Sequence, residues 1–311
     1  MKESEPLSKF TLPNYQFDRV IATGGMSVVL HGRRLSDGME VALKLLTPEF
    51  AAVTEYLEKL FQRGSEGEVA AQLHHRNVVR TLDYGTRRGQ YYILMEFIDG
   101  PNLSQLIRSG DERWKRHRNQ LLLAVGRGLT YIHQNNLVHR DLCPKNILVS
   151  GDIVPKVIDF GLAIPRSFKA DWKFDRSGTP SYMAPEQVRG QQVDFRTDIY
   201  AFGVTAYEIL TGERPYPYAR TRMGKMQPHL NIEPPGPRRY DRNIPVPLEF
   251  ILMKAIEKTK DRRYQTMDAL MRDMQHVYTA FYGSHVAAEP VDAAAQVKPA
   301  AEPSQQTGTT S

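Results

Sequence analysis

Cysteine is almost absent from this sequence, which contains only Cys143 among its 311 residues. An internal disulfide is therefore impossible, and a lone thiol cannot form a zinc site by itself, so we expect no structural metal. Long apolar runs are missing as well. None approaches the roughly eighteen residues that a membrane span needs, and the start of the chain lacks the apolar stretch of a secretory signal. These absences predict a cytoplasmic protein without a membrane span.

Basic residues are in slight excess, but no dense basic segment occurs. The chain has 41 Lys and Arg against 35 Asp and Glu, which gives a formal charge of +6 and a pI near 9.2. Proteins that bind nucleic acid concentrate such charge in an arm or a stripe. Because the basic residues are scattered here, we expect no nucleic-acid partner, although a mildly positive surface could attract acidic substrates.

Composition divides the chain into three parts. Residues 1–14 are polar with two prolines and are predicted to be a lead-in, whereas residues 282–311 are rich in Ala, Pro, Gln, Thr and Ser. A segment of that kind cannot bury enough apolar surface to order itself, so we expect a disordered tail for which a binding partner is possible. Residues 15–281 remain as the folded domain.

Periodicity changes in the middle of this domain. Short β-rich runs separated by turns occupy 15–22, 27–34, 39–46, 78–85 and 90–97, with one helical stretch near 55–74. After Gly100, helical apolar spacing is found in 116–134, 197–212 and 248–258. A hinge is natural at 96–101. We therefore predict an α+β fold of two lobes, an N-terminal lobe (15–98) with an antiparallel sheet and one main helix, and a mainly helical C-terminal lobe (99–281).

A glycine-containing segment joins the first two predicted strands. It consists of Ile21, Ala22, Thr23, Gly24, Gly25, Met26, Ser27, Val28 and Val29. Small residues let a backbone approach a phosphate chain and direct N–H groups at it. An ordinary hairpin turn explains this segment equally well, so it carries weight only together with other motifs.

Lys44 stands in an otherwise apolar strand, Val41-Ala-Leu-Lys44. An unpaired buried ammonium is costly, so Lys44 needs an anionic partner, either a phosphate or a carboxylate. Glu66 is preferred to Glu68, because two helical steps of about 200° place these side chains on opposite faces. A solvated surface position is the alternative for either glutamate.

The most informative segment is His139-Arg-Asp-Leu-Cys-Pro-Lys-Asn146, which Val157-Ile-Asp-Phe-Gly161 follows after a turn. Asp141 and Asn146 share one loop, and Asp159 ends the next apolar strand. These oxygen-bearing side chains can converge on a nucleophile and Mg²⁺.

Taken in order, these segments and Ala184-Pro-Glu186 resemble the signature set of protein kinases over residues 15–281. The run from Gly178 to Glu186 is similar to that of bacterial Ser/Thr kinases related to the eukaryotic ones. The resemblance implies a bilobal protein-kinase fold and an enzyme that transfers the γ-phosphoryl group of ATP, with Mg²⁺, to Ser or Thr hydroxyls of protein substrates, with autophosphorylation.

The resemblance also implies roles for single residues. Lys44 would hold the α- and β-phosphates and Glu66 would orient it, Asp159 and Asn146 would bind Mg²⁺, and Asp141 would accept the hydroxyl proton.

Further roles concern the adenine site and the support of the catalytic loop. Met95 would be the gatekeeper, and the implied adenine contacts are Ala42, Glu96, Ile98 and Leu148. Three supporting side chains are also implied, namely Thr179 bracing Asp141, Asp198 anchoring the catalytic loop, and Arg263 pairing with Glu186.

The sequence departs from the family at the glycine segment and in the catalytic loop. Ala22 and Ser27 replace usual glycines, and Cys143 stands where a lysine usually touches the γ-phosphate, while Lys145 lies two residues later. We hypothesise that Lys145 reaches the γ-phosphate or acidic substrate residues. A solvent-facing lysine is the alternative. These departures leave a pseudokinase scaffold open as a second function. Phosphorylation of a small molecule or sugar is a third, but the run from Gly178 to Glu186 favours protein substrates.

Regulatory features lie between Asp159 and Glu186. Ser167 and Ser177 are candidate phosphosites, and Asp175 stands where many relatives carry a phosphorylated threonine. A carboxylate of charge −1 can partly replace a phosphate of about −1.5 to −2, which predicts activity without that phosphate. Gly64 and Gly67 predict a loosely held helix, because each helical glycine costs about 1 kcal/mol relative to alanine. Substrate identity, upstream signal and oligomeric state stay open.

Overall fold

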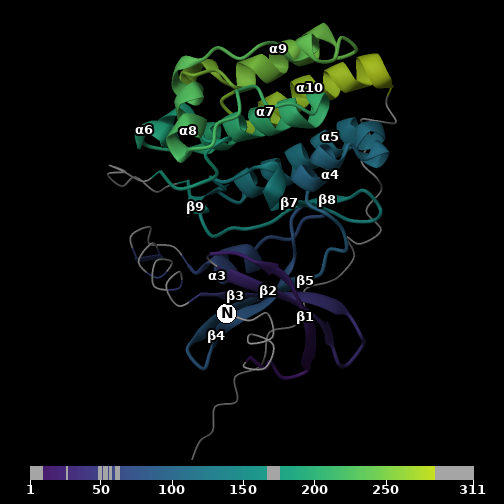
Figure 1. The fold of residues 1–311 in the computed structure, drawn as a ribbon, viewed down its shortest axis with the longest axis vertical. Helices are drawn as coiled ribbons and strands as arrows, with labels where there is room; N and C mark the ends of the chain where they lie inside the picture. Colours follow the sequence, from purple (N-terminus) through teal and green to yellow (C-terminus); the bar gives the residue numbers. More distant parts are fainter. Residues whose placement is uncertain are drawn as a thin grey trace, which may run out of the picture.

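The computed structural model describes residues 10–25, 27–47, 51, 55, 58, 59, 64–166 and 176–283. Two lobes stand one above the other in Figure 1, with the strand-rich N-terminal lobe below and the helices of the C-terminal lobe above. The chain passes from one lobe to the other after the last strand of the sheet. The predicted bilobal α+β architecture is confirmed.

The N-terminal lobe is built on one antiparallel sheet. Its strands are β1 (Tyr15–Thr23), β2 (Ser27–Arg34), β3 (Glu40–Leu46), β4 (Thr81–Arg87) and β5 (Gln90–Glu96). They are arranged in the order β1-β2-β3-β5-β4, so β3 lies at the centre. Side chains alternate between the two faces of a strand, and Leu30, Leu43 and Leu94 form a buried cluster on one face. The other face of β3 carries Lys44 toward the second lobe.

The predicted lead-in is shorter than expected. Phe10 and Leu12 are buried with the sheet cluster, and the Phe10 ring lies 5.6 Å from the ring of Tyr92. Residues 1–14 are polar on average, so their composition did not indicate that these two apolar side chains are buried. They cover an apolar part of the sheet that would otherwise face water. The N-terminal lobe therefore begins at least five residues before the predicted boundary at residue 15.

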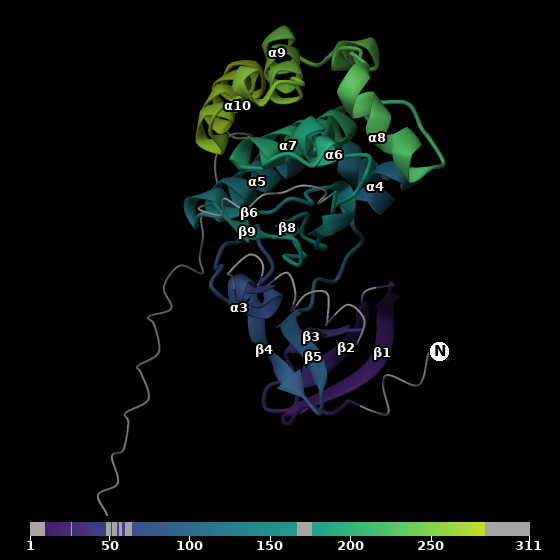
Figure 2. The same cartoon turned by 90° about the vertical axis from the view of Figure 1, so that its left-hand side faces the viewer.

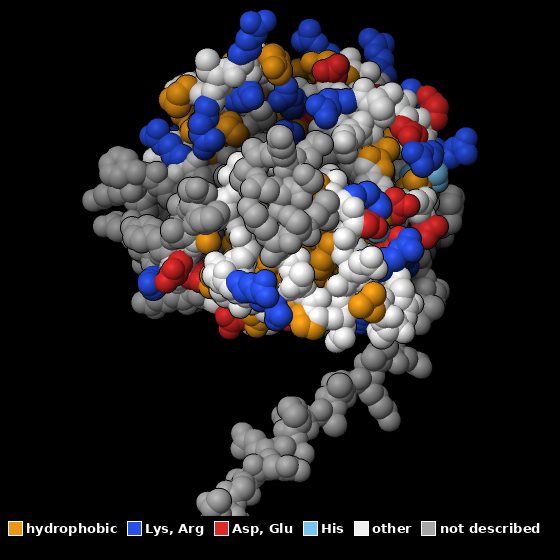
Figure 3. Space-filling view, turned by 60° about the horizontal axis from the view of Figure 1, so that its bottom comes forward, with side chains coloured by type: hydrophobic (Ala, Val, Ile, Leu, Met, Phe, Trp, Pro, Cys, Tyr) orange, Lys and Arg blue, Asp and Glu red, His pale blue; other side chains and the backbone are white. Residues whose placement is uncertain are grey.

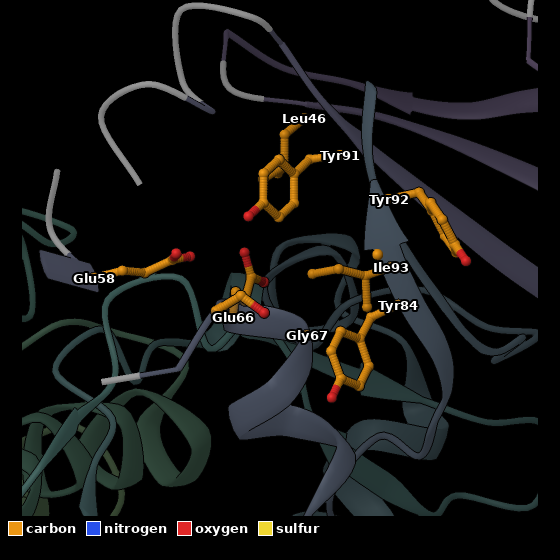
Figure 4. Close-up of a pocket in the computed structure, with 10 residues that line it drawn as sticks. Leu46, Glu58, Glu66, Gly67, Tyr84, Tyr91, Tyr92 and Ile93 are labelled. Carbon is orange, nitrogen blue, oxygen red and sulfur yellow. The ribbon is translucent and has the colours of Figure 1, made fainter. Parts of the chain in front are cut away.

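Helix α3 (Glu66–Ala71) packs beside β4, on the side of the sheet nearest the C-terminal lobe (Figure 2). Ser65 is its N-cap, accepting a hydrogen bond from the Glu68 N–H at 3.1 Å. Gly64 precedes the helix, so the predicted weakening by helical glycines applies to Gly67 alone. A Cβ at Gly67 would lie 2.4 Å from Cβ of Tyr84, so glycine is required there for close packing on β4 (Figure 4).

The C-terminal lobe is mainly helical. Its helices are α4 (Leu103–Ser109), α5 (Glu112–Gln134), α6 (Pro185–Arg189), α7 (Phe195–Thr211), α8 (Arg222–Asn231), α9 (Val246–Ala255) and α10 (Met267–Tyr282). The short strands are β6 (Leu137–Val138), β7 (Ile147–Val149), β8 (Pro155–Val157) and β9 (Ile164–Pro165), and 3₁₀ turns cover Pro144–Asn146, Pro237–Arg239 and Lys260–Arg262.

Helices α5 and α7 form the centre of this lobe. Helix α7 is almost entirely buried, as expected of a helix surrounded by others. Helix α10 ends at Tyr282, one residue beyond the predicted end of the domain. Within the described residues, no helix has both the length and the apolar character needed to cross a membrane.

The segment after α3 ties the two lobes together. The Val79 N–H donates to the Val157 carbonyl at 3.0 Å, and the Val157 N–H donates to the Asn77 carbonyl at 2.9 Å. The Asn77 side chain also donates to the carbonyl of Pro155 at 2.9 Å. Strand β8 of the C-terminal lobe is thereby bound to the N-terminal lobe, and the residues that follow β8 have a fixed position relative to the sheet.

Candidate active site

A cavity of about 650 Å³ lies between the sheet and the first segments of the C-terminal lobe. This volume is typical of pockets that enclose a small organic ligand. Its walls come from β1, β2, β3, α3 and β5, and from the connection 97–102, strand β7 and the residues that follow β8. The cavity therefore lies where the two lobes meet.

Four residues of the glycine segment line this cavity: Ile21, Ala22, Ser27 and Val29. Thr23, Gly24, Gly25 and Val28 are not part of the lining. Val28 packs against the apolar cluster of the sheet, as the alternation of strand side chains requires. Met26 lies outside the described residues. A Cβ at Gly24 would meet only the Ser27 carbonyl oxygen, at 3.8 Å, so the fold itself does not demand glycine there.

Every residue expected to surround an adenine ring lines the same cavity, namely Ala42, Met95, Glu96, Ile98 and Leu148. Sequence reasoning missed further apolar lining residues, among them Val79, Ile93 and Ile158. Ile158 directly precedes Asp159, and alternation along the chain could have assigned it; no motif marks Val79.

Lys44 lies at the inner wall of the cavity between two carboxylates. Its Nζ is 2.6 Å from Oε1 of Glu66 and 3.0 Å from Oδ1 of Asp159. Burial disfavours the charge of Lys44, but the carboxylates of Asp159 and Glu66 outweigh that effect and raise its pKa above the ordinary value. The Lys44 ammonium in turn lowers the pKa of Asp159, against burial. Of the two glutamates considered, Glu66 is the one that contacts Lys44.

Asp141 is held by its neighbours in the loop and by Thr179. Its Oδ1 accepts the Thr179 N–H at 2.6 Å, and its Oδ2 accepts from the Asn146 amide at 3.1 Å. Burial raises the pKa of Asp141, and the hydrogen bonds from Thr179 oppose that rise. The Ile158 N–H donates to the Asn146 carbonyl at 3.0 Å, so the Asp141 loop and Asp159 are adjacent.

A buried aspartate from α7 supports this loop. Asp198 accepts hydrogen bonds from the N–H groups of His139 and Arg140, each at 2.7 Å, and pairs with His133 Nε2 at 2.9 Å. The backbones of Arg140 and Asp159 have φ of 69° and 68°, a region that residues with a Cβ rarely adopt. Such strain persists only where the surroundings impose it. Asp198 of α7 therefore holds the loop that contains His139 and Arg140 in a strained backbone conformation.

One further expected contact is present, between Arg263 and Glu186. Arg263 donates two hydrogen bonds to Glu186, both at 2.8 Å, and the pair is buried. Thr197 adds a third hydrogen bond to the same carboxylate, at 2.8 Å. Although burial opposes its charge, the pKa of Glu186 is lowered by Arg263. This pair fixes the end of the segment 176–186.

Cys143 and Lys145 have opposite environments. Cys143 is fully buried in an apolar cluster, and its thiol lies 3.6 Å from Oγ1 of Thr179. Burial raises the pKa of this thiol to about 12. Lys145 is exposed and lines the mouth of the cavity. Of the regulatory candidates, Ser177 is described, whereas Ser167 and Asp175 lie outside the described residues.

Comparison with known proteins agrees with this geometry. The model of the protein kinase domain matches residues 15–277, and the chain belongs to the protein kinase family. It is 32% identical over 269 residues to the serine/threonine-protein kinase PrkC of Bacillus subtilis, and 32% identical over 271 residues to the serine/threonine-protein kinase PknB of Mycobacterium leprae. These matches cover 86% and 85% of this chain but 41% and 43% of the relatives. The chain thus spans about two fifths of their length.

Proposed function

We propose that this chain transfers the γ-phosphoryl group of ATP to Ser or Thr hydroxyls of protein substrates, its own included. The observation that carries the proposal is the position of Lys44, which Glu66 and Asp159 hold at the wall of a cavity of suitable size. A lysine in that position can neutralise phosphate oxygens, and the nearby Asp141 can accept a proton. Since the reaction consumes ATP, we propose the cytoplasm as its compartment.

The adenine ring is assigned to the outer part of the cavity. Ala42 from the sheet and Leu148 from the second lobe would cover its two faces, with Met95 at the inner end. The Glu96 N–H already donates to the Arg80 carbonyl at 3.0 Å. The proposal therefore uses the Glu96 carbonyl and the Ile98 N–H as the hydrogen-bonding groups for adenine. The phosphates would extend under the glycine segment toward Lys44.

The donor set suits Mg²⁺. Magnesium prefers oxygen ligands and is usually held by one or two protein groups together with substrate phosphates. Asn146 uses its amide nitrogen for the Asp141 carbonyl, at 2.9 Å, which leaves its amide oxygen for a cation beside Asp159. Among the described residues no cluster of three or more His, Cys, Asp or Glu side chains is suited to a metal, so the phosphates must complete the site. When bound, the ion would neutralise charge on the phosphates.

Asp141 is proposed as the base for the attacking hydroxyl. Phosphoryl transfer has a loose transition state, so the protein acts mainly by positioning and charge neutralisation. The hydrogen bond from the Thr179 N–H fixes one oxygen of Asp141, and Asn146 fixes the other. A general base of this kind contributes roughly 10²- to 10⁴-fold.

Labelled ATP with Mg²⁺ tests the proposal. The purified chain should incorporate phosphate into itself and into a mixture of protein substrates, and Asp141→Asn should lower the rate by about 10²- to 10⁴-fold. Nucleotide binding should be retained in this variant, because Asp141 is not part of the cavity lining. A chain that binds nucleotide but transfers nothing to any protein would be a scaffold, and the proposal would be wrong.

A further inference from the structure

The segment 176–181, which contains Thr179, is itself held by two arginines. Arg214 lies in the loop after α7, and Arg222 lies in α8. Thr179 donates to Asp141, and Ser181, two residues later, accepts a hydrogen bond from Arg214 Nη1 at 2.9 Å. Arg222, the first residue of α8, donates to the main-chain carbonyl of Arg176. Two successive Cα separations of about 3.8 Å place Ser181 within about 8 Å of Thr179. A positive charge therefore lies beside the residues next to the proposed base.

Other cations are exposed along the same edge. Arg176, Arg220 and Arg222 are exposed, and Lys145 is exposed at the mouth of the cavity. Of the lining residues that follow strand β5, Asn102 and Gln105 are uncharged, and Asp99 is an exposed carboxylate. In the face drawn in Figure 3, Lys and Arg side chains gather in the upper part with few acidic side chains among them.

Nearby carboxylates are mostly occupied inside the fold. Glu208 accepts a hydrogen bond from the hydroxyl of Tyr182, and both residues are buried. Glu186 is paired with Arg263. Glu213 and Asp99 are exposed, but they are outnumbered by the exposed cations of this edge. Among the described residues, exposed cations thus outnumber exposed carboxylates on the surface next to Asp141.

We propose that this edge selects protein segments in which Asp or Glu residues flank the target hydroxyl. The proposal rests on the proposed function and adds the substrate class to it. Guanidinium groups match carboxylates with paired hydrogen bonds, so Arg214 and Arg222 are the specificity-determining residues, assisted by Arg220. Complementary charge at such an edge increases the rate of encounter and disfavours segments of like charge.

Three matched peptides test the preference. Each has one central Ser, flanked by Glu in the first, by Gln in the second and by Lys in the third. The kcat/KM for the Glu peptide should exceed that for the Gln peptide by about fivefold or more, because each exposed charge pair contributes about two- to fivefold. The Lys peptide should be the poorest substrate. Raising the salt concentration should reduce the differences, since exposed charges are screened.

Variants of the arginines test which residues cause the preference for the Glu peptide. In Arg214→Gln/Arg222→Gln the ratio of kcat/KM between the Glu and Gln peptides should fall toward one, whereas Arg272→Gln, an exposed arginine of α10, should keep the wild-type ratio. A ratio is used because structural damage lowers both rates together. If the double variant fails to fold, Arg220→Gln should still lower the ratio by about twofold.

The results distinguish failure of the acidic preference from failure of the proposed function. Phosphoryl transfer with equal rates for the three peptides, or a preference for the Lys peptide, overturns the acidic preference and leaves the proposed function intact. An unchanged ratio in the double variant overturns the assignment to Arg214 and Arg222. Absence of transfer to every peptide and to the chain itself contradicts the proposed function instead.

Discussion

At the scale of single residues, positions 143 and 145 differ from the usual kinase pattern, because a buried cysteine stands where a lysine is usual and the lysine comes two residues later. Cys143 is packed among apolar side chains and touches Thr179, so a charged side chain at that position would have to displace the cluster. Lys145 instead extends from the 3₁₀ turn Pro144–Asn146 to the mouth of the cavity. The lysine of this loop therefore lies on its exposed side.

Replacing Lys145 by Ala should lower kcat about tenfold or more, since a charge-assisted hydrogen bond to phosphate contributes about 1.5–3 kcal/mol. Steady-state rates at saturating ATP measure this change. Lys145→Arg is the control, because it keeps the charge and should retain most of the rate. Unchanged transfer for every substrate tried would show that Lys145 is merely a solvent-facing lysine.

The thiol of Cys143 should be inert in the folded protein. Its raised pKa of about 12 leaves a negligible thiolate fraction at pH 8, and its side chain is fully buried. A colorimetric thiol reagent should therefore detect no reactive thiol at pH 8 in native protein and one per chain in denaturant. Rapid labelling of the native protein, at a rate typical of an exposed cysteine, would contradict the buried position.

At the scale of elements, α3 depends on a close contact with β4. The missing side chain of Gly67 lets the helix approach Tyr84 (Figure 4). The same helix carries Glu66 to Lys44. Sequence reasoning assigned glycine here a loosening effect, whereas the structure gives it a packing function. Both effects act on one helix, and their balance determines how firmly the ion pair is held.

Gly67→Ala should lower kcat/KM, because the added methyl must push α3 away from β4 and with it Glu66 from Lys44. Overpacking of this kind costs roughly 1–3 kcal/mol of unfolding free energy. Hydrogen exchange of the α3 amides should become faster in the variant. Gly151→Ala is the matched control, since a Cβ there would meet no atom within 4 Å. Equal activity and exchange in wild type and Gly67→Ala would refute this role.

Sequence periodicity was sufficient for the sheet and the long helices, because residues such as Leu30, Leu43 and Leu94 alternate in the strands while α5 and α7 repeat at helical spacing. The motif residues of the site could also be assigned, since Lys44 and Asp159 stand out as charges in apolar surroundings. The burial of Phe10 depends on a contact with Tyr92 more than eighty residues away, which no local pattern contains.

At the scale of the whole molecule, an ion pair joins the lobes beside the predicted hinge at 96–101. Glu96 at the end of β5 lies 2.7 Å from Nζ of Lys156 on β8, and the same Glu96 oxygen accepts the Arg80 N–H at 2.8 Å. Both partners of the ion pair are largely buried. This pair could not be predicted from sequence. Lys156 lies on a short strand before the Asp159 motif, and nothing in that strand distinguishes it from a lysine exposed at the edge of a sheet.

Lys156→Met should weaken ATP binding by a few-fold and lower the unfolding free energy by roughly 1–2 kcal/mol, between the values for exposed and buried pairs. The Glu96 carboxylate loses its cation, and the hinge gains freedom that nucleotide binding must remove. Calorimetric titration and denaturant unfolding measure the two effects. Lys115→Met, which breaks an exposed pair with Glu112, should change neither. Identical ATP affinity in Lys156→Met and wild type would rule out a function of this pair in the hinge.

The single, inaccessible thiol of Cys143 has a practical consequence. Fluorophores attached through maleimide chemistry would find no background target on the native chain, so new cysteines could be labelled cleanly without first deleting the natural one. Leu35 in the N-terminal lobe and Phe250 in the C-terminal lobe are 65% and 71% exposed. A donor and an acceptor dye at Leu35→Cys and Phe250→Cys would report the opening and closing of the lobes by energy transfer.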